Sequence, residues 1–136
     1  MNFLAQMIPW LVYGATTVSP WTNVDNPQPN VNGLVGEVTS LPYTVPAGYN
    51  LVITNYGIEG GKAPQYALIP WVGEPPVTNN QGLMTCAAAY GSNAYSGMTW
   101  ILPSGMKLNA RISNSGDTDP YCYGWFLSGY LQPIYH

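Results

Sequence analysis

Charge is what this 136-residue sequence has least of. Charged residues make up 7% of the chain, against about 25% in an ordinary soluble domain. The only basic residues are Lys62, Lys107 and Arg111. So few cations can neutralise few phosphates, which argues against nucleic acid as a partner. A surface of neutral polar and aromatic groups is typical of a chain that its neighbours cover, because stable interfaces are depleted in charge.

Histidine is nearly absent as well, so the chain lacks the side chain that most acid–base catalysis uses. The single histidine is His136, the last residue, so a Ser/His or Cys/His relay has no base and a Cys/His zinc site is not expected. No serine lies in a nucleophile-elbow motif, and no glycine cluster opens a helix after a strand. The acidic residues lie almost entirely in turn-rich segments. These absences predict a protein that is not an enzyme and needs no cofactor.

Cysteines and long apolar runs are scarce too. Cys86 and Cys122 are too few for a disulfide scaffold. Two reduced, half-buried thiols are expected, and a bridge between them stays open. The apolar run in residues 3–13 is interrupted by Pro9 and falls short of the about 20 residues that span a bilayer. It also lacks the basic region of a signal peptide and a basic face, so a membrane is not expected as a partner.

Turn residues are abundant, and they divide the chain into short alternating runs. Residues 42–56 and 100–112 share one pattern, in which an apolar run meets a Pro-small-Gly turn and an alternating strand follows. We interpret them as two equivalent corners of one fold. With a final alternating run at 121–131, the count is seven or eight short strands without βαβ alternation. The sequence predicts an all-β, antiparallel β-sandwich of jelly-roll type at 34–136.

The first 33 residues are predicted to be an extended arm and linker. Residues 3–13 are apolar, and residues 19–33 are rich in Pro and Asn, which do not hold a regular ladder. Two interpretations of the apolar run stay open: a short helix or strand that closes the chain's own sandwich, or an arm that docks on a neighbouring subunit. The arm is the working hypothesis. Its expected contact residues are Phe3, Leu4, Ile8, Trp10, Leu11, Tyr13 and Trp21.

Two polar loops are candidates for binding a sugar. Aromatic rings can stack on sugar rings, and lectins place such aromatics beside Asn, Asp and Gln in loops. The loop at 73–81 is long and polar, with two Asn and one Gln, and the loop at 91–97 has Tyr95 beside Asn93, with Tyr90 just before it. The candidate glycan-binding residues are Tyr90, Asn93 and Tyr95.

One turn cluster is a weak candidate for Ca²⁺, because it offers three hard oxygen ligands within six residues. The ligands are Asn114, Asp117 and Asp119. Their spacing matches no EF-hand loop, and an Asx-type turn is the other interpretation.

The two corners and the last strand together resemble small jelly-roll structural proteins of tailed bacteriophages. The residues that carry the resemblance are YTVPAG at 43–48 with LVI at 51–53, ILPSG at 101–105 with LNAR at 108–111, and GWFLSGYL at 124–131. Capsid decoration or cement proteins and receptor-binding or fibre tips both use such modules. Cupins share the Pro-x-Gly corner but carry metal-binding histidines on their strands, and this chain has none there.

The resemblance implies a non-enzymatic, trimeric virion component with no catalytic residues to carry over. The function expected first is a capsid decoration or cement protein that clamps neighbouring subunits with its arm and oligomerises through its Tyr-rich faces. Its partners would be sister copies and other virion proteins such as the major capsid protein. It would be assembled in the host cytoplasm and exposed on the particle. The alternative is a receptor-binding or lectin-like tail tip that binds host surface glycan through its loops.

Overall fold

A computed structural model of the chain describes residues 7–60, 66–73, 84–85, 89–90, 93–95, 99–114 and 119–134, with the backbone alone between 84 and 95. In these ranges every regular element is a β-strand. The strands are β1 (Ile8–Val18), β2 (Thr22–Asp25), β3 (Tyr43–Thr44), β4 (Tyr49–Glu59), β5 (Tyr66–Val72), β6 (Met84–Thr85), β7 (Ala89–Tyr90), β8 (Asn93–Tyr95), β9 (Trp100–Leu102), β10 (Lys107–Asn114) and β11 (Tyr121–Pro133).

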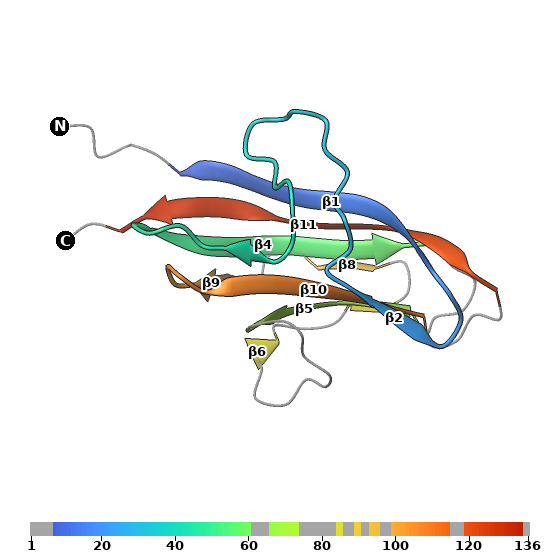
Figure 1. Ribbon diagram of the computed structural model, residues 1–136. Coiled ribbons are helices and arrows are strands. Elements are labelled where there is room, and N and C mark those ends of the chain that lie inside the picture. Colours follow the sequence, from blue (N-terminus) through green and yellow to red (C-terminus); the bar gives the residue numbers. More distant parts are fainter. Residues whose placement is uncertain are drawn as a thin grey trace.

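The strands form two antiparallel sheets that pack face to face (Figure 1). Sheet A has the order β1-β11-β4-β8, and β9 lies beside another part of β4 on the same edge as β8. Sheet B has the order β2-β10-β5-β6, with β3 further along the β2 edge of β10 and β7 further along the β6 edge of β5. Each sheet therefore has four strand positions, and the chain passes repeatedly between the sheets. This arrangement is a jelly roll and confirms the predicted fold class.

The two predicted corners lie side by side and connect the sheets at one end of the sandwich. The backbone N–H of Val45 donates to the carbonyl oxygen of Met106 at 2.9 Å, and the N–H of Gly105 donates to the carbonyl oxygen of Val45 at 2.9 Å. Gly48 and Gly105 have φ of 85° and 84°. A side chain disfavours that left-handed backbone, which explains why a glycine ends both Pro-x-Gly turns.

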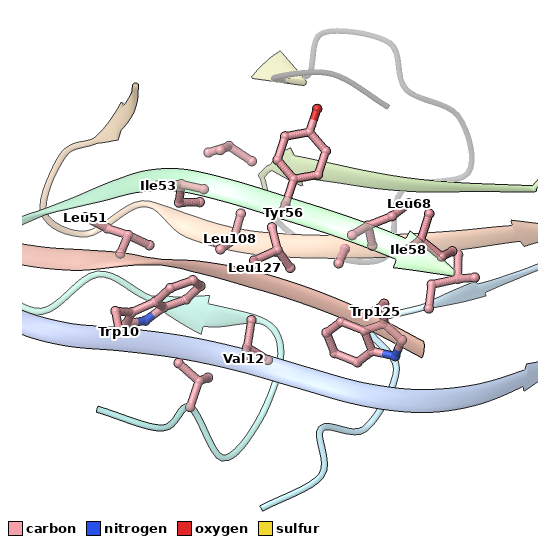
Figure 2. Packing of buried hydrophobic residues seen from close by; sticks show 14 of the residues in the cluster. Trp10, Val12, Leu51, Ile53, Tyr56, Ile58, Leu68, Leu108, Trp125 and Leu127 are labelled. Carbon is pink, nitrogen blue, oxygen red and sulfur yellow. The ribbon is translucent and has the colours of Figure 1, made fainter. Parts of the chain in front are cut away.

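The core lies between the sheets and is lined by every second residue of the long strands. On β11 the inward side chains are Tyr123, Trp125 and Leu127, all at most 3% exposed. Leu108, Ala110 and Ile112 of β10 face the core as predicted, but Asn109 between them is also fully buried, because its amide bonds to Asn26 and to the carbonyl oxygen of Gly73. Figure 2 shows part of this cluster gathered between the strands. Burial of each large apolar side chain stabilises the fold by roughly 1.5–3 kcal/mol.

The predicted N-terminal arm is wrong for residues 8–18, because they form β1 at the edge of sheet A. This strand pairs with β11 along its whole length. Trp10 and Val12 face sheet B and are 3% and 0% exposed, so the apolar run belongs to the chain's own core. Pro9 is tolerated because its missing N–H would lie on the edge away from β11, where the N–H of Leu11 also points.

The predicted linker is wrong in part as well. Residues 22–25 form β2, which pairs with residues 111–114 of β10. Since β1 and β2 belong to different sheets, a division at residue 33 does not separate an arm from a body. The segment between β2 and β3, which does contain the prolines and asparagines, projects beyond β1 (Figure 1).

Candidate functional site

The outer face of sheet A is built largely from aromatic and aliphatic side chains. Alternation along β1 and β11 places Tyr13 opposite Phe126 on this face. Tyr130 lies between Pro9 on one side and Val52 on the other. The apolar side chains that define the outer face of sheet A are Leu11, Tyr13, Val52, Ile101, Phe126 and Tyr130. Of these, Ile101 is 49% exposed, whereas Val52 is covered by its neighbours and only 1% exposed.

The polar groups in the middle of this face bond to one another. A β-bulge shifts the register of β4 and β11 between Ser128 and Gly129. There the hydroxyl groups of Ser128 and Thr54 both donate to Asn55 Oδ1, at 2.8 and 2.7 Å. Glu59, at the end of β4, is the only charged residue among the described outward side chains of sheet A. The middle of the face therefore has little polarity left to desolvate when it is covered.

An exposed apolar loop tip, residues 31–35, lies in the segment that projects beyond β1. Its aliphatic side chains are Val31, Leu34 and Val35, which are 52%, 56% and 85% exposed. Glu37 orders this tip, because its Oε1 accepts hydrogen bonds from the backbone N–H groups of Asn32 at 2.7 Å and Gly33 at 3.0 Å. The tip is thus an organised apolar projection.

The edge of β1 is covered by the same segment. The N–H of Leu11 donates to the carbonyl oxygen of Gly36 at 3.0 Å, and the N–H of Val38 donates to the carbonyl oxygen of Leu11 at 2.6 Å. The N–H of Asn30 donates to the carbonyl oxygen of Tyr13 at 2.9 Å. Backbone groups paired in this way cannot recruit a strand from another chain. Contacts with neighbours are therefore expected through the face of sheet A and not through this part of its edge.

A shallow pocket of about 220 Å³ opens between β1 and the segment that covers it. Its apolar wall is formed by Ile8, Val38 and Leu131. Trp10 and Tyr43 also line it, with their ring centroids 5.4 Å apart and their planes 64° apart. Its polar lining residues include Glu37, Thr39 and Ser40. We name this site the edge pocket.

Two residues that line the edge pocket each have a buried polar atom without a hydrogen-bond partner. The two atoms are Glu37 Oε2 and Trp10 Nε1. Partial burial raises the pKa of Tyr13, and the charge of Glu37 and its contact with the hydroxyl raise it further. Burial also raises the pKa of Tyr43, which the nearby indole N–H of Trp10 partly opposes. Each orphaned atom therefore has a tyrosine near it, but no hydrogen bond of normal geometry.

The predicted arm residues are distributed over three environments. Trp10 lies in the core and Ile8 lines the edge pocket, while Leu11 and Tyr13 belong to the outer face of sheet A. The predictions for Phe3 and Leu4 fall outside the described residues. Of the predicted arm residues in β1, Leu11 and Tyr13 lie on the outer face of sheet A and Trp10 does not.

Trp21 is exposed, but it does not join the other predicted arm residues. It lies in the turn between β1 and β2, is 73% exposed and has φ of 60°. Such a left-handed backbone is uncommon for a bulky side chain and stores strain. The hydroxyl of Thr22 donates to the carbonyl oxygen of Ser19 at 2.7 Å and helps to close this turn.

The backbone of the predicted glycan residues joins the two sheets. Tyr90 is in β7, which pairs with β5 of sheet B, whereas Asn93 and Tyr95 are in β8, which pairs with β4 of sheet A. Their side chains lie outside the described part of the structure, as do most residues of the loops at 73–81 and 91–97. The glycan interpretation of these loops therefore stays a prediction.

The proposed Ca²⁺ ligands do not form a common set among the described residues. Asn114 is fully buried, and its Nδ2 donates to the carbonyl oxygens of Val18 at 3.1 Å and Asp119 at 3.5 Å. This amide therefore ties β10 to the end of β1. The side chain of Asp119 is exposed, and Asp117 falls outside the described residues. No cluster of three His, Cys, Asp or Glu side chains occurs in the parts of the chain that are described.

Cys122 carries a free thiol and is exposed, so its predicted half-burial is wrong. It lies on β11 in the outward phase, opposite Thr17. Cys86 falls outside the described residues, and its state stays a prediction.

Sheet B carries an ion pair on its outer side. Arg111 Nε donates to Asp25 Oδ1 at 2.6 Å and its Nη2 donates to Oδ2 at 3.2 Å. The Asp25 side chain is 44% exposed, so water screens much of the attraction. We expect Asp25→Asn to lower the free energy of unfolding by at most about 1 kcal/mol. Urea unfolding at low and high salt checks this, and a larger loss that salt does not reduce would contradict it.

Comparisons with models of protein families, with curated proteins and with solved structures found no match. Among the described residues, no helix has the length and apolar character needed to cross a membrane. The functional interpretation therefore depends on the outer face of sheet A. The sequence drew attention to the Tyr-rich faces in general, but nothing in it singled out Asn55.

Proposed function

We propose that this protein is a non-enzymatic structural component of a virus particle, of the decoration or cement type, which works by assembling with copies of itself and with other virion proteins. The observation that carries the proposal is the outer face of sheet A, with its aromatic side chains and, among its described residues, a single charged one at one end. The virion setting is supported by the resemblance of the two corners and the last strand to phage jelly-roll proteins.

The dimensions of this face suit a stable contact. β1 is 11 residues long, and with a rise of about 3.4 Å per residue and a strand spacing of about 4.8 Å, four strand positions cover roughly 700 Å². A standard interface buries about 800 Å² per partner. The loop tip at 31–35 adds further apolar surface beside the face. Together they supply the area that one contact needs.

A second copy of the chain is the partner that this face fits best. A neutral surface gives no charge pattern for a strongly acidic or basic partner to read. Copies of this chain repel each other little, because the net charge is −3 over 136 residues. Tyr and Phe side chains contribute large contact area at low entropic cost, and they are enriched in interfaces. A homotrimer is the form that the phage resemblance favours.

The mechanism differs from the clamping arm expected from the sequence. Because residues 8–18 are fixed in sheet A, they contribute to assembly only through their outward side chains, Leu11 and Tyr13. The loop tip at 31–35 takes the place of the arm as the projecting element. Neighbours are then held by a flat face and a short projection, with no strand exchanged between subunits.

A charge placed in the middle of the outer face tests this proposal. Phe126→Glu puts a carboxylate at every copy of the contact, which is expected to weaken association by roughly 3 kcal/mol, or about a hundredfold in the dissociation constant. The matched control is Asn23→Glu, which adds the same charge to exposed β2 of sheet B. The measurement is mass by light scattering after gel filtration, over a range of concentrations.

The wild type and Asn23→Glu are expected to have a mass that is a multiple of the 14.8 kDa chain. Phe126→Glu is expected to shift toward the mass of a single chain. A wild type that remains a single chain at every concentration rejects the proposal. A Phe126→Glu variant that assembles like the wild type assigns the contact to another surface.

A further inference from the structure

The middle of the outer face of sheet A holds three polar side chains, Thr54, Asn55 and Ser128, which we name the amide cluster. All three residues are only half-buried. Asn55 Oδ1 accepts the hydroxyl groups of Ser128 and Thr54 at 2.8 and 2.7 Å, so both lone pairs of this oxygen are used. Asn55 Nδ2, in contrast, has no hydrogen-bond partner in the described part of the chain. This nitrogen keeps contact with solvent, unlike Glu37 Oε2 and Trp10 Nε1.

A molecule that covers the outer face takes this amide nitrogen out of water. An N–H group that is buried without an acceptor weakens binding, so the covering surface has to place an oxygen at this position. A second copy of the chain can supply that oxygen. The hydroxyl of Ser128 donates its only proton to Asn55 but keeps its own lone pairs, so it can accept a hydrogen bond. The amide cluster thus contains both halves of the hydrogen bond that it requires from a neighbour.

The side chains around the amide cluster distinguish one alignment of two such faces from the others. Leu11 lies opposite Ser128 on β1, and Phe126 and Tyr130 lie on either side of Ser128 along β11. An alignment that is shifted by two residues along the strands brings Asn55 Nδ2 opposite an aromatic ring or an aliphatic chain, which leaves the amide unpaired. A single polar residue in an apolar contact sets the register of coiled coils in the same way.

We propose that Asn55 sets the alignment of neighbouring copies, because its Nδ2 donates to the Ser128 hydroxyl of the copy that covers it, and that copy donates in return from its own Asn55. This inference rests on the assembly function proposed above. A group that meets its own counterpart lies close to the symmetry axis of the contact, so the amide cluster marks that axis on the outer face of sheet A. The apolar side chains supply the contact area, and Asn55 selects one alignment.

A complementary pair of variants tests this contact between copies. Asn55→Leu removes the donor and Ser128→Ala removes the acceptor. An assembly that contains both variants has one intact contact and one in which both groups are apolar, so no amide is left unpaired. Ser128→Ala by itself leaves the amide unpaired in every contact. Mixed assemblies are therefore expected to be favoured about tenfold over the statistical proportion. One variant is labelled with ¹⁵N, the two are dissociated by dilution and reassociated together, and native mass spectrometry measures the proportion of mixed forms.

The control pair is Asn50→Leu with Ser128→Ala, which makes the same change near the start of β4 and is expected to mix statistically. A change in the bonds within one chain accompanies that copy into every assembly, so it does not favour mixed forms. Asn55→Ala replaces Asn55→Leu if the leucine variant does not fold. Statistical mixing of the complementary pair, or an equal preference in the control pair, rejects the proposal and leaves the assembly function standing. A wild type that stays a single chain rejects both.

Discussion

A chain that begins at Gly14 is expected to lose the folded sandwich. The deletion removes the first six residues of β1, and with them the side chains of Trp10 and Val12 from the core. Loss of a buried tryptophan side chain alone costs about 3–5 kcal/mol, while a typical domain is stable by about 5–15 kcal/mol. It also leaves the ladder of β11 from 126 to 131 without its β1 partner. Far-UV circular dichroism and urea unfolding measure the outcome.

The matched control is a chain that begins at Met7. It keeps all of β1 and is expected to unfold at the same urea concentration as the full chain, within error. A folded sandwich in the chain that begins at Gly14 would show that residues 8–13 are a separable arm. Loss of assembly alone, without loss of the circular dichroism signal, would support the same conclusion. The experiment thus separates a strand of the core from an arm that only contacts neighbours.

The sequence left the N-terminal run open between a strand of the chain's own sandwich and a docking arm, because the period-2 signal was hidden; the structure confirms the strand. A half-buried strand is recognised when apolar and polar residues alternate. In β1 the outward residues Leu11 and Tyr13 are as apolar as the inward Trp10 and Val12, since the outer face of sheet A is itself apolar. The sequence of β1 therefore shows one continuous apolar run in place of an alternation. The apolar outward side chains of β1 thus obscured the strand in the sequence, and the same side chains support the assembly proposal.

The corners and the last strand were predicted correctly because local chemistry determines them. A proline fixes the first turn position and a glycine accepts the positive φ found at Gly48 and Gly105. In the strand that follows the second corner, Leu108, Ala110 and Ile112 face the core as the sequence predicted. Such turn and strand signals involve only a few neighbouring residues, so they can be recognised in the sequence without knowledge of the fold. They gave the fold class, but not the partners of each strand.

The edge pocket could not be predicted, because it depends on register between distant segments. Glu37 follows a glycine in a turn, and nothing nearby in sequence indicates a ligand site. It meets Trp10 and Tyr43 only because residues 36–38 pair with the edge of β1 and because β3 pairs with β10. Similarly, Asn114 resembled a cation ligand in sequence, but in the fold its amide bonds the end of β1.

Replacing Gly129 by alanine is expected to destabilise the protein by about 3 kcal/mol or more. Gly129 lies on β11 at the bulge, where a Cβ atom would sit 1.8 Å from the carbonyl oxygen of Val52 and 2.9 Å from Ile53 Cα. These are backbone atoms of β4, so no side-chain rotation relieves the overlap. Ordinary overpacking costs about 1–3 kcal/mol, and here the two central strands of sheet A must separate.

Gly124→Ala is the matched control on the same strand. Its Cβ would lie 3.6 Å from Glu59 Cγ, an ordinary contact, so the free energy of unfolding is expected to change by less than about 1 kcal/mol. Urea unfolding of both variants gives the comparison. Equal stabilities would mean that β4 and β11 do not approach as closely as the bulge requires. A selective loss in Gly129→Ala ties the bulge, and the bonded Ser128, Asn55 and Thr54 groups that it places on the outer face, to a contact between backbones that only glycine allows.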